Sequence, residues 1–153
     1  MSTPDRDDLA PGIDDGPPYV GALLRLCLEQ VRGRIEADMR AAGFGDLQPT
    51  HFAVLSYPPP DGLRPSELAR RIRMSRQATN HVIAQLETLG YLERRAEQEG
   101  DRRRIYLTAR SWDTVKVIHG TLLRIQAEWA AEIGPERFRD FMATLRHFAA
   151  KGS

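Results

Sequence analysis

The chain has 153 residues and is nearly neutral, with 22 basic and 21 acidic side chains and a formal net charge of +1. Its single cysteine excludes an internal disulfide framework and a cysteine-rich zinc site. No apolar run reaches the roughly 18 residues that span a membrane, and residues 1–18 lack the basic flank and apolar core of a signal peptide. These features predict a cytoplasmic protein without a membrane contact.

Positive charge is concentrated in one part of the sequence. Residues 64–110 carry eleven arginines and six acidic residues, whereas residues 1–16 carry one arginine and five aspartates. A local excess of this kind suits the neutralisation of phosphate groups, so double-stranded DNA is the expected partner. A solvated basic face is the simpler alternative, which charge alone leaves open.

The N-terminal third of the chain predicts an acidic arm followed by two helices. Residues 1–16 have too little apolar surface to offset the entropy of ordering, so we expect them to be disordered. An amphipathic helix is expected from Pro18 to about Ala42, because its apolar positions recur at three- and four-residue spacing. A shorter helix begins near Pro49, where a first helical turn tolerates proline, and a run of prolines at 58–60 ends it.

The central part of the sequence predicts two short helices and a β-hairpin. The first of these helices opens at Pro65, and the second has a good N-cap in Ser75 and a good C-terminal stop in Gly90. Two strands are expected at 91–96 and 103–107, with glycine in the loop between them. Two helices with a tight turn and a hairpin behind them are typical of a winged helix-turn-helix.

Two more helices are expected after the hairpin, at about 110–133 and beyond the break at 134–135. Apolar side chains in the first of them repeat at the spacing of a helix that is packed along its whole length, and this stripe would stay exposed unless another element covered it. The predicted fold is therefore mainly α with a minor β part. A winged helix-turn-helix at 46–109 is flanked by helical dimerisation segments at 17–45 and 110–150.

The helix that follows Ser75 has a face suited to reading DNA. Gln77 and Asn80 lie opposite the apolar side, and their amides can pair bidentately with adenine, as arginine does with guanine. Glu87 would repel phosphate, so we expect it to lie beyond the groove. The buried stripe of this helix is predicted to consist of Ala78, Val82, Leu86 and Leu89.

The hairpin loop runs into three consecutive arginines, Arg102, Arg103 and Arg104. Arginine side chains enter narrow minor grooves, where the negative potential is strongest. Asp101 could hold one of the three by a charge-assisted hydrogen bond while another enters the groove. An arginine-rich loop that merely keeps a hairpin soluble is the alternative, and the adjacent helix-turn-helix argues against it.

The segments SELARRI, MSRQATNHVIAQLETLGYLERR and DRRRIYLT resemble the MarR family of bacterial regulators. The resemblance extends from about residue 18 to 149, although the helical flanks match in pattern only. It implies a homodimer held by the first helix and the last two, a palindromic operator, usually repression, and release by a small, often phenolic ligand.

The resemblance also implies which residues contact DNA. The base-reading positions of the family fall on Arg76, Gln77, Asn80 and His81, and its wing arginine falls on Arg103, with Arg102 and Arg104 as neighbours. Backbone contacts fall on Thr50 and His51, and Ser75 and Thr79 complete the expected set. The chain departs from the family where only three residues separate Arg103 from the closing Leu107-Thr108, so the choice among the three arginines stays open.

The sequence also bears on other possible functions of the chain. An enzyme is disfavoured because the sequence has no glycine-rich phosphate loop, nucleophile elbow or metal-ligand cluster, and neither a cofactor nor a metal is expected. A winged helix used for protein contacts only would have no need of the local positive charge.

Cys27 lies on the apolar stripe of the first helix, either as a small buried hydrophobe or as a redox sensor like that of the peroxide-sensing branch of the family. The aromatic residues Tyr57, Trp112 and Trp129 could line a ligand crevice or belong to the core.

Overall fold

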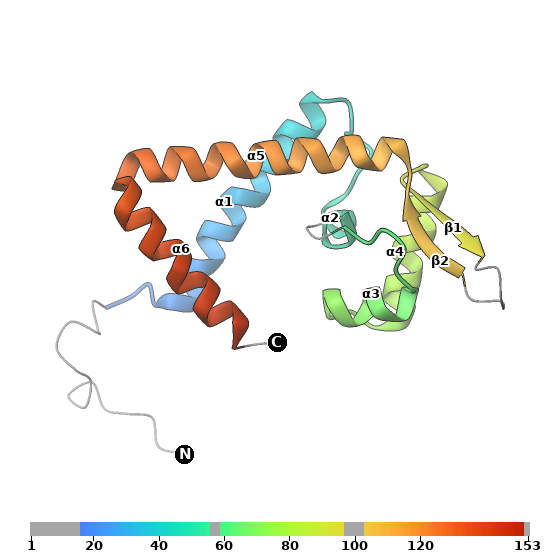
Figure 1. Ribbon diagram of the computed structural model, residues 1–153, viewed down its shortest axis with the longest axis horizontal. Coiled ribbons are helices and arrows are strands. Elements are labelled where there is room, and N and C mark those ends of the chain that lie inside the picture. The colour runs from blue at the N-terminus through green and yellow to red at the C-terminus, as the bar shows by residue number, and fades with distance from the viewer. Residues whose placement is uncertain (1–15, 56–58, 97–102, 152–153) are drawn as a thin grey trace, which may run out of the picture. The chain divides into compact units, whose positions relative to one another are not determined.

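The computed structural model describes residues 16–55, 59–96 and 103–151. The chain divides into two compact units, 1–33 and 34–153, and the first helix runs through the boundary between them. The predicted acidic arm lies outside the described residues except for Gly16. The described elements, in chain order, are α1 (Val20–Ala41), α2 (Pro49–Leu55), α3 (Pro65–Ile72), α4 (Arg76–Thr88), β1 (Leu92–Ala96), β2 (Arg103–Leu107), α5 (Ala109–Ile133) and α6 (Pro135–Ala150) (Figure 1).

Capping interactions explain where the two most important helices of the second unit begin and end. Ser75 caps α4, because its hydroxyl accepts a hydrogen bond of 3.1 Å from the backbone N–H of Ala78. Gly90 follows α4 with a φ of 81°, a left-handed conformation that disfavours other residues. Thr108 caps α5 by accepting from the N–H of Ser111 at 3.3 Å. The predicted helix boundaries at Ser75 and Gly90 are therefore confirmed.

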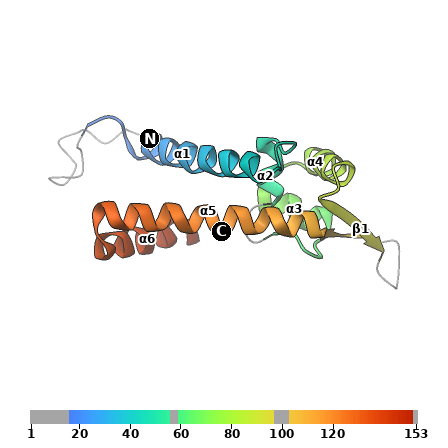
Figure 2. The same ribbon diagram turned by 90° about the horizontal axis from the view of Figure 1, so that it is seen from above.

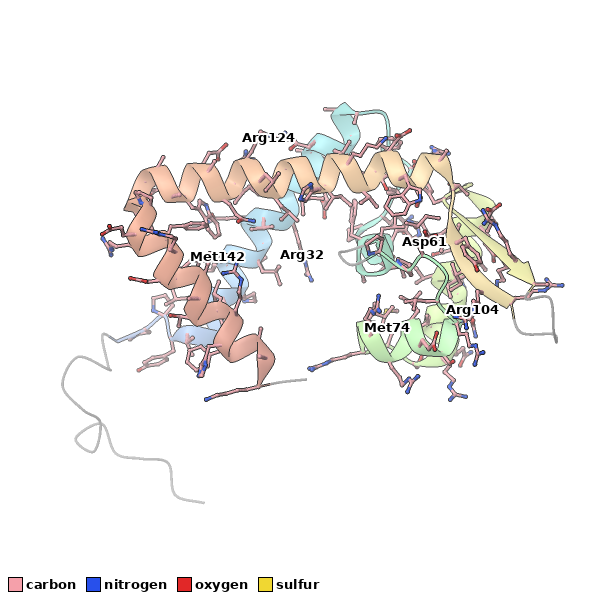
Figure 3. The ribbon with its side chains drawn as sticks, viewed as in Figure 1. Arg32, Asp61, Met74, Arg104, Arg124 and Met142 are labelled. Carbon is pink, nitrogen blue, oxygen red and sulfur yellow. The ribbon has the colours of Figure 1, made fainter. Side chains whose placement is uncertain are left out.

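The hairpin is a two-stranded antiparallel sheet with Leu92 opposite Leu107. The segment before α3 adds to it, since Leu63 forms an isolated antiparallel bridge with Ile105. Asp61, labelled at the base of the hairpin in Figure 3, accepts a hydrogen bond of 3.1 Å from the N–H of Leu107. The β2 strand therefore cannot swing away from the helix-turn-helix without breaking these backbone bonds.

One hydrophobic core joins α2, α3, α4 and the hairpin. The side of α4 that faces this core differs from the prediction, because Ala78 and Leu89 are only partly buried. The helix is rotated toward Thr79 and Ile83, which are both 0% exposed. The predicted stripe followed the apolar residues on the Ala78 side of Val82 and therefore missed both the polar Thr79 and the apolar Ile83. The buried residues of α4 are Thr79, Val82, Ile83 and Leu86.

Polar contacts join the last turns of α1 to α5 within the second unit. Arg34 makes a bidentate ion pair with Glu128, at 2.8 and 3.0 Å. Asp38 accepts hydrogen bonds of 2.6 Å from both the Thr121 hydroxyl and Arg124, which is labelled on α5 in Figure 3. These partners hold the pKa of Asp38 below its ordinary value, first through the Thr121 hydroxyl and then through the Arg124 guanidinium.

The C-terminal helix α6 leaves the end of α5 obliquely (Figure 1), lies beneath α5 when seen from above (Figure 2), and is in contact with it. Phe138 is buried there, and Trp129 meets Phe141 edge to face with ring centroids 6.4 Å apart. Trp129 thus belongs to a packed aromatic cluster, whereas Trp112 is exposed. Tyr57 lies outside the described residues.

Both units nevertheless expose large apolar side chains. None of the described helices is long and apolar enough to cross a membrane. Patches of this kind in water usually mark an interaction surface. Cys27, expected on the apolar side of α1, is itself exposed. The exposed residues are Tyr19, Val20, Leu23, Leu24, Leu26 and Leu28 in the first unit, and Trp112, Leu123, Ile133, Phe141 and Phe148 in the second.

Candidate nucleic-acid interface

The N-terminal half of α4 presents a polar face to solvent. The structure leaves Arg76, Gln77, Asn80 and His81 exposed, as the sequence predicts. Thr79 is the exception, because its side chain is completely buried and its hydroxyl has no hydrogen-bond partner among the described residues. Thr79 therefore belongs to the core and is removed from the set of expected DNA contacts.

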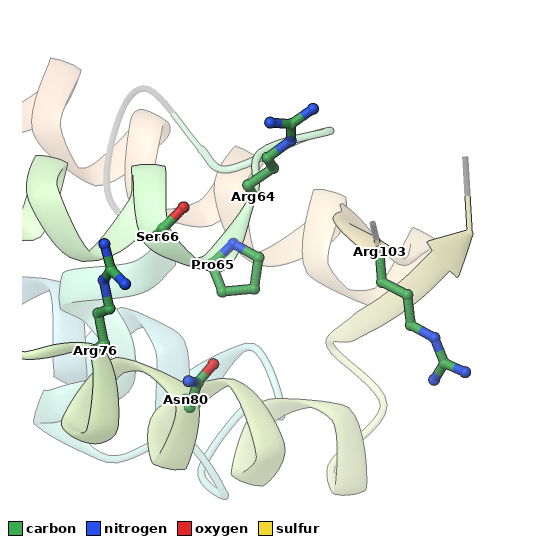
Figure 4. Close-up of a pocket in the computed structure, with 6 residues that line it drawn as sticks. All are labelled: Arg64, Pro65, Ser66, Arg76, Asn80 and Arg103. Carbon is green, nitrogen blue, oxygen red and sulfur yellow. The ribbon is translucent and has the colours of Figure 1, made fainter. Parts of the chain in front are cut away.

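Three elements meet around a depression of about 530 Å³ beside this face (Figure 4). Arg76 and Asn80 come from α4, Ser66 from the first turn of α3, and Arg103 from the start of β2. Two further residues, Arg64 and Pro65, complete the lining. A hollow bordered by three arginines and by amide and hydroxyl groups offers hydrogen-bond donors to phosphate oxygens and to base edges.

The start of α3 is held rigidly beside this depression. Glu67 accepts a hydrogen bond of 2.9 Å from the backbone N–H of Arg64, which is half of a capping box. That hydrogen bond is the main reason that the pKa of Glu67 is lowered, and the positive charges of Arg104, Arg64 and Arg70 add to the effect. Sequence reasoning overlooked Arg64 and Ser66 as site residues, although proline at the first helical position and glutamate two residues later signal this helix start.

The wing arginines have different surroundings. Arg103 is exposed and borders the depression. Arg104 is partly buried and donates from Nη1 to the carbonyl oxygen of Gly62 at 2.8 Å, which fastens β2 to the loop before α3 (Figure 3). Neighbouring residues of a strand point to opposite faces, so the side chains of Arg103 and Arg104 leave β2 in different directions. Arg102 lies outside the described residues, as does the Asp101 that was expected to orient an arginine.

Glu87 lies near the other end of α4 and does not stand alone. Its carboxylate accepts from Nε of Arg94 on β1 at 3.0 Å, and both side chains are partly exposed. The ion pair neutralises the acidic group that would otherwise repel phosphate. The position of Glu87 relative to a DNA groove stays a prediction.

His51 was expected to contact the DNA backbone, but its side chain is only 3% exposed. The N–H of Gln48 donates to Nδ1 at 3.0 Å, so Nε2 carries the ring proton and donates to Oε1 of Gln85 at 3.2 Å. Both ring nitrogens are thus used inside the protein, and neither is available to a phosphate. The neighbouring Thr50 is exposed, so of this expected pair only Thr50 is accessible.

Comparison with known proteins connects this geometry to a family. The MarR family model matches residues 46–104, which span α2 to the start of β2. No curated protein sequence matches the chain.

Solved structures match over nearly the whole chain. The Mycobacterium tuberculosis MarR family protein RV2887, in complex with salicylic acid, is 28% identical, with a TM-score of 0.62 over 88% of this chain and 98% of that one. The Staphylococcus aureus MepR–DNA complex is 14% identical, with a TM-score of 0.67 over 88% of this chain and 97% of that one. A MarR transcriptional regulator from Methanosarcina mazei Go1 is 15% identical and covers 90% of this chain and 91% of its own, with a TM-score of 0.71.

The described elements therefore define a winged helix-turn-helix protein with long helical flanks. Its match over residues 46–104, together with the 28% identity to RV2887, confirms the resemblance to the MarR family. The chain has the fold of the MarR-family transcription regulators.

Proposed function

We propose that the chain is a DNA-binding transcription regulator that acts as a homodimeric repressor on a palindromic operator. The observation that carries this proposal is the convergence of Arg76, Asn80 and Arg103 around one depression. Helix α4 would enter the major groove with its N-terminal half, and Arg103 would reach the backbone or the minor groove beside it. The MepR–DNA complex, which shares the fold, supports this mode of binding.

A second copy of the chain is the proposed cover for the exposed apolar surface. Helices α1, in its first half, and α6 both expose large apolar side chains, with Val20 71% and Phe148 63% exposed. Two-fold symmetry would place two copies of α4 about 34–36 Å apart on one face of DNA. Sedimentation at a mass of about 35 kDa, twice the 17.3 kDa chain, is expected. A monomer at micromolar concentration would overturn the proposal that a dimer binds a palindromic operator.

A small aromatic acid is the proposed effector, because RV2887 was solved with salicylic acid. Salicylate should weaken DNA binding at millimolar concentration, and benzyl alcohol, which has the ring without the carboxylate, should not. Release of DNA by salicylate and benzyl alcohol alike would indicate nonspecific denaturation of the protein. Release by neither would remove this effector class while leaving the DNA-binding proposal intact.

The test of DNA binding begins with selection of duplexes from a random pool. Gln77→Ala or Asn80→Ala should cost about 1–3 kcal/mol on the best selected site and little on unrelated DNA. Thr88→Ala is the control, since Thr88 is exposed on the same helix but lies at its other end. Binding of the wild-type protein should weaken steeply as salt rises. Binding that depends on neither salt nor sequence would favour a protein-contact module instead.

Redox control through Cys27, which is exposed in the single chain, is a second candidate. Peroxide should then lower the DNA affinity of the wild-type protein, and Cys27→Ser should abolish that response. An unchanged response in Cys27→Ser would exclude the cysteine as the sensor.

A further inference from the structure

Three segments far apart in the sequence meet at Tyr91, which lies between α4 and β1. Its side chain is completely buried, and its hydroxyl donates to Oδ1 of Asp46 at 2.6 Å. Asp46 belongs to the loop between α1 and α2. Arg110, from the first turn of α5, places its guanidinium 4.4 Å from the centre of the Tyr91 ring and donates to Oδ2 of Asp46 at 2.8 Å. The carboxylate is thus shared by a buried phenol and a cation.

The same cluster fastens the C-terminal end of α4 to the start of α5. Arg110 donates from Nη1 to the carbonyl oxygen of Leu89 at 2.8 Å, where the helix dipole favours a positive charge. The Thr108 hydroxyl, at the N-cap of α5, donates to the carbonyl oxygen of Gly90 at 2.7 Å. The carbonyl groups of the two residues that follow α4 therefore accept hydrogen bonds from side chains at the start of α5. We call Asp46, Tyr91 and Arg110 the joint.

The joint lies where a change of angle would be magnified. Helix α5 is 25 residues long, or about 37 Å at 1.5 Å per residue. Its middle is tied to the last turns of α1 through the Arg34–Glu128 and Asp38–Arg124 ion pairs. Helix α4 is 13 residues long, or about 20 Å. A small rotation of α4 about its attachment to α5 would therefore displace its N-terminal half, which lies at the end away from the joint.

We propose that the joint fixes the direction of α4 relative to α5 and thereby determines which half-site spacing the dimer accepts. This inference rests on the proposed function. Asp46, Tyr91 and Arg110 are positioning residues, because all three act through α4 and lie outside the depression lined by Arg76, Asn80 and Arg103.

Removal of the Tyr91 hydroxyl is the sharpest test. Tyr91→Phe keeps the buried ring but deletes the hydrogen bond to Asp46, and Tyr106→Phe makes the same change on β2 without touching the joint. The probes are the best palindrome selected by the wild-type protein, the same palindrome with one base pair added or removed at its centre, and a duplex with a single half-site.

The wild-type protein and Tyr106→Phe should bind the selected spacing at least tenfold more tightly than the altered ones. Tyr91→Phe should keep its half-site affinity within about twofold while this preference falls severalfold. Should Tyr91→Phe fail to fold by circular dichroism, Arg110→Lys replaces it, because lysine keeps the charge but cannot bridge Asp46 and Leu89 in the same way.

Two results would overturn the proposal that the joint determines the spacing preference. One is an unchanged spacing preference in a folded Tyr91→Phe protein. The other is an equal loss of affinity for the half-site and the palindrome, which would make the hydroxyl a support of the DNA-binding unit alone. Absence of salt-dependent binding by the wild-type protein would instead refute the proposed function itself, so the two failures are distinguishable.

Discussion

His51 Nε2 lies 3.2 Å from Oε1 of Gln85, and this hydrogen bond joins α2 to α4. The opposite ring nitrogen accepts from the N–H of Gln48, the residue just before α2. His51 therefore does what a glutamate does in a capping box, and it also reaches across to α4. A side chain in this position supports α4 from the side opposite its exposed polar face.

His51→Leu should lower the free energy of unfolding by about 2 kcal/mol, because it leaves the Gln48 N–H and the Gln85 amide without their partner. DNA affinity should fall with it, but the slope of log affinity against log salt should not change, since no phosphate contact is lost. Urea unfolding and binding at several salt concentrations measure the two effects. A reduced slope would show that His51 contacts a phosphate after all, and Thr50→Val provides the comparison for an exposed neighbour.

Arg103 and Arg104 should respond differently to alanine. Arg103→Ala should weaken binding to many sequences, most of all to those with A/T-rich narrow minor grooves, and should leave thermal stability unchanged. Arg104→Ala should lower stability by about 1 kcal/mol, because the bond that fastens β2 to Gly62 is lost. Calorimetry and competition binding with A/T-rich and G/C-rich duplexes separate these outcomes. Equal effects of the two substitutions on both measurements would contradict the division of roles.

Arg73 occupies the turn between α3 and α4 with a φ of 55°, the left-handed conformation that glycine adopts without strain. Arg73→Gly should therefore raise the free energy of unfolding by up to about 1 kcal/mol. The matched control is Arg71→Gly, inside α3, which should lower it by about 1 kcal/mol through loss of helix propensity. Urea unfolding measures both. Destabilisation by Arg73→Gly would mean that the arginine side chain contributes more than its backbone conformation costs.

Local sequence signals predicted the parts of the fold that depend on local chemistry. Ser75 and Gly90 marked the limits of α4, and the strand at 103–107 was placed correctly, because caps, glycine turns and β-branched residues act on their immediate neighbours. The exposed face of α4 also followed from helical periodicity, which identified Gln77 and Asn80.

Contacts between distant segments were not predictable in the same way. His51 was expected to contact DNA because the family resemblance implied it, and nothing near it in sequence reveals the Gln85 partner on α4. Asp46 and Arg110 are 64 residues apart, so their ion pair depends on how α5 leaves the hairpin. Thr79 was misplaced for a related reason, since its burial follows from the packing of neighbouring elements around α4 and not from its own polarity.

Tyr91 should give the protein a distinctive response to alkali. Burial is the main cause that raises the pKa of its phenol far above the ordinary 10.0, and the hydrogen bond to Asp46 and the charge of that carboxylate add to it. The raised pKa belongs to the folded state. The protonated phenol therefore makes its full contribution to the free energy of unfolding below pH 10. That contribution is lost as the pH rises further, because Tyr91 ionises first in the unfolded chain.

Absorbance at about 295 nm, which reports tyrosinate, should therefore show one tyrosine that ionises only when the chain unfolds. Tyr91→Phe should remove that late step and flatten the decline of stability between about pH 10 and 11, whereas Tyr106→Phe should leave both in place. If the late step survived in Tyr91→Phe, the phenol buried against Asp46 would not be its source, and the hydrogen bond at the centre of the joint would have to be reassigned.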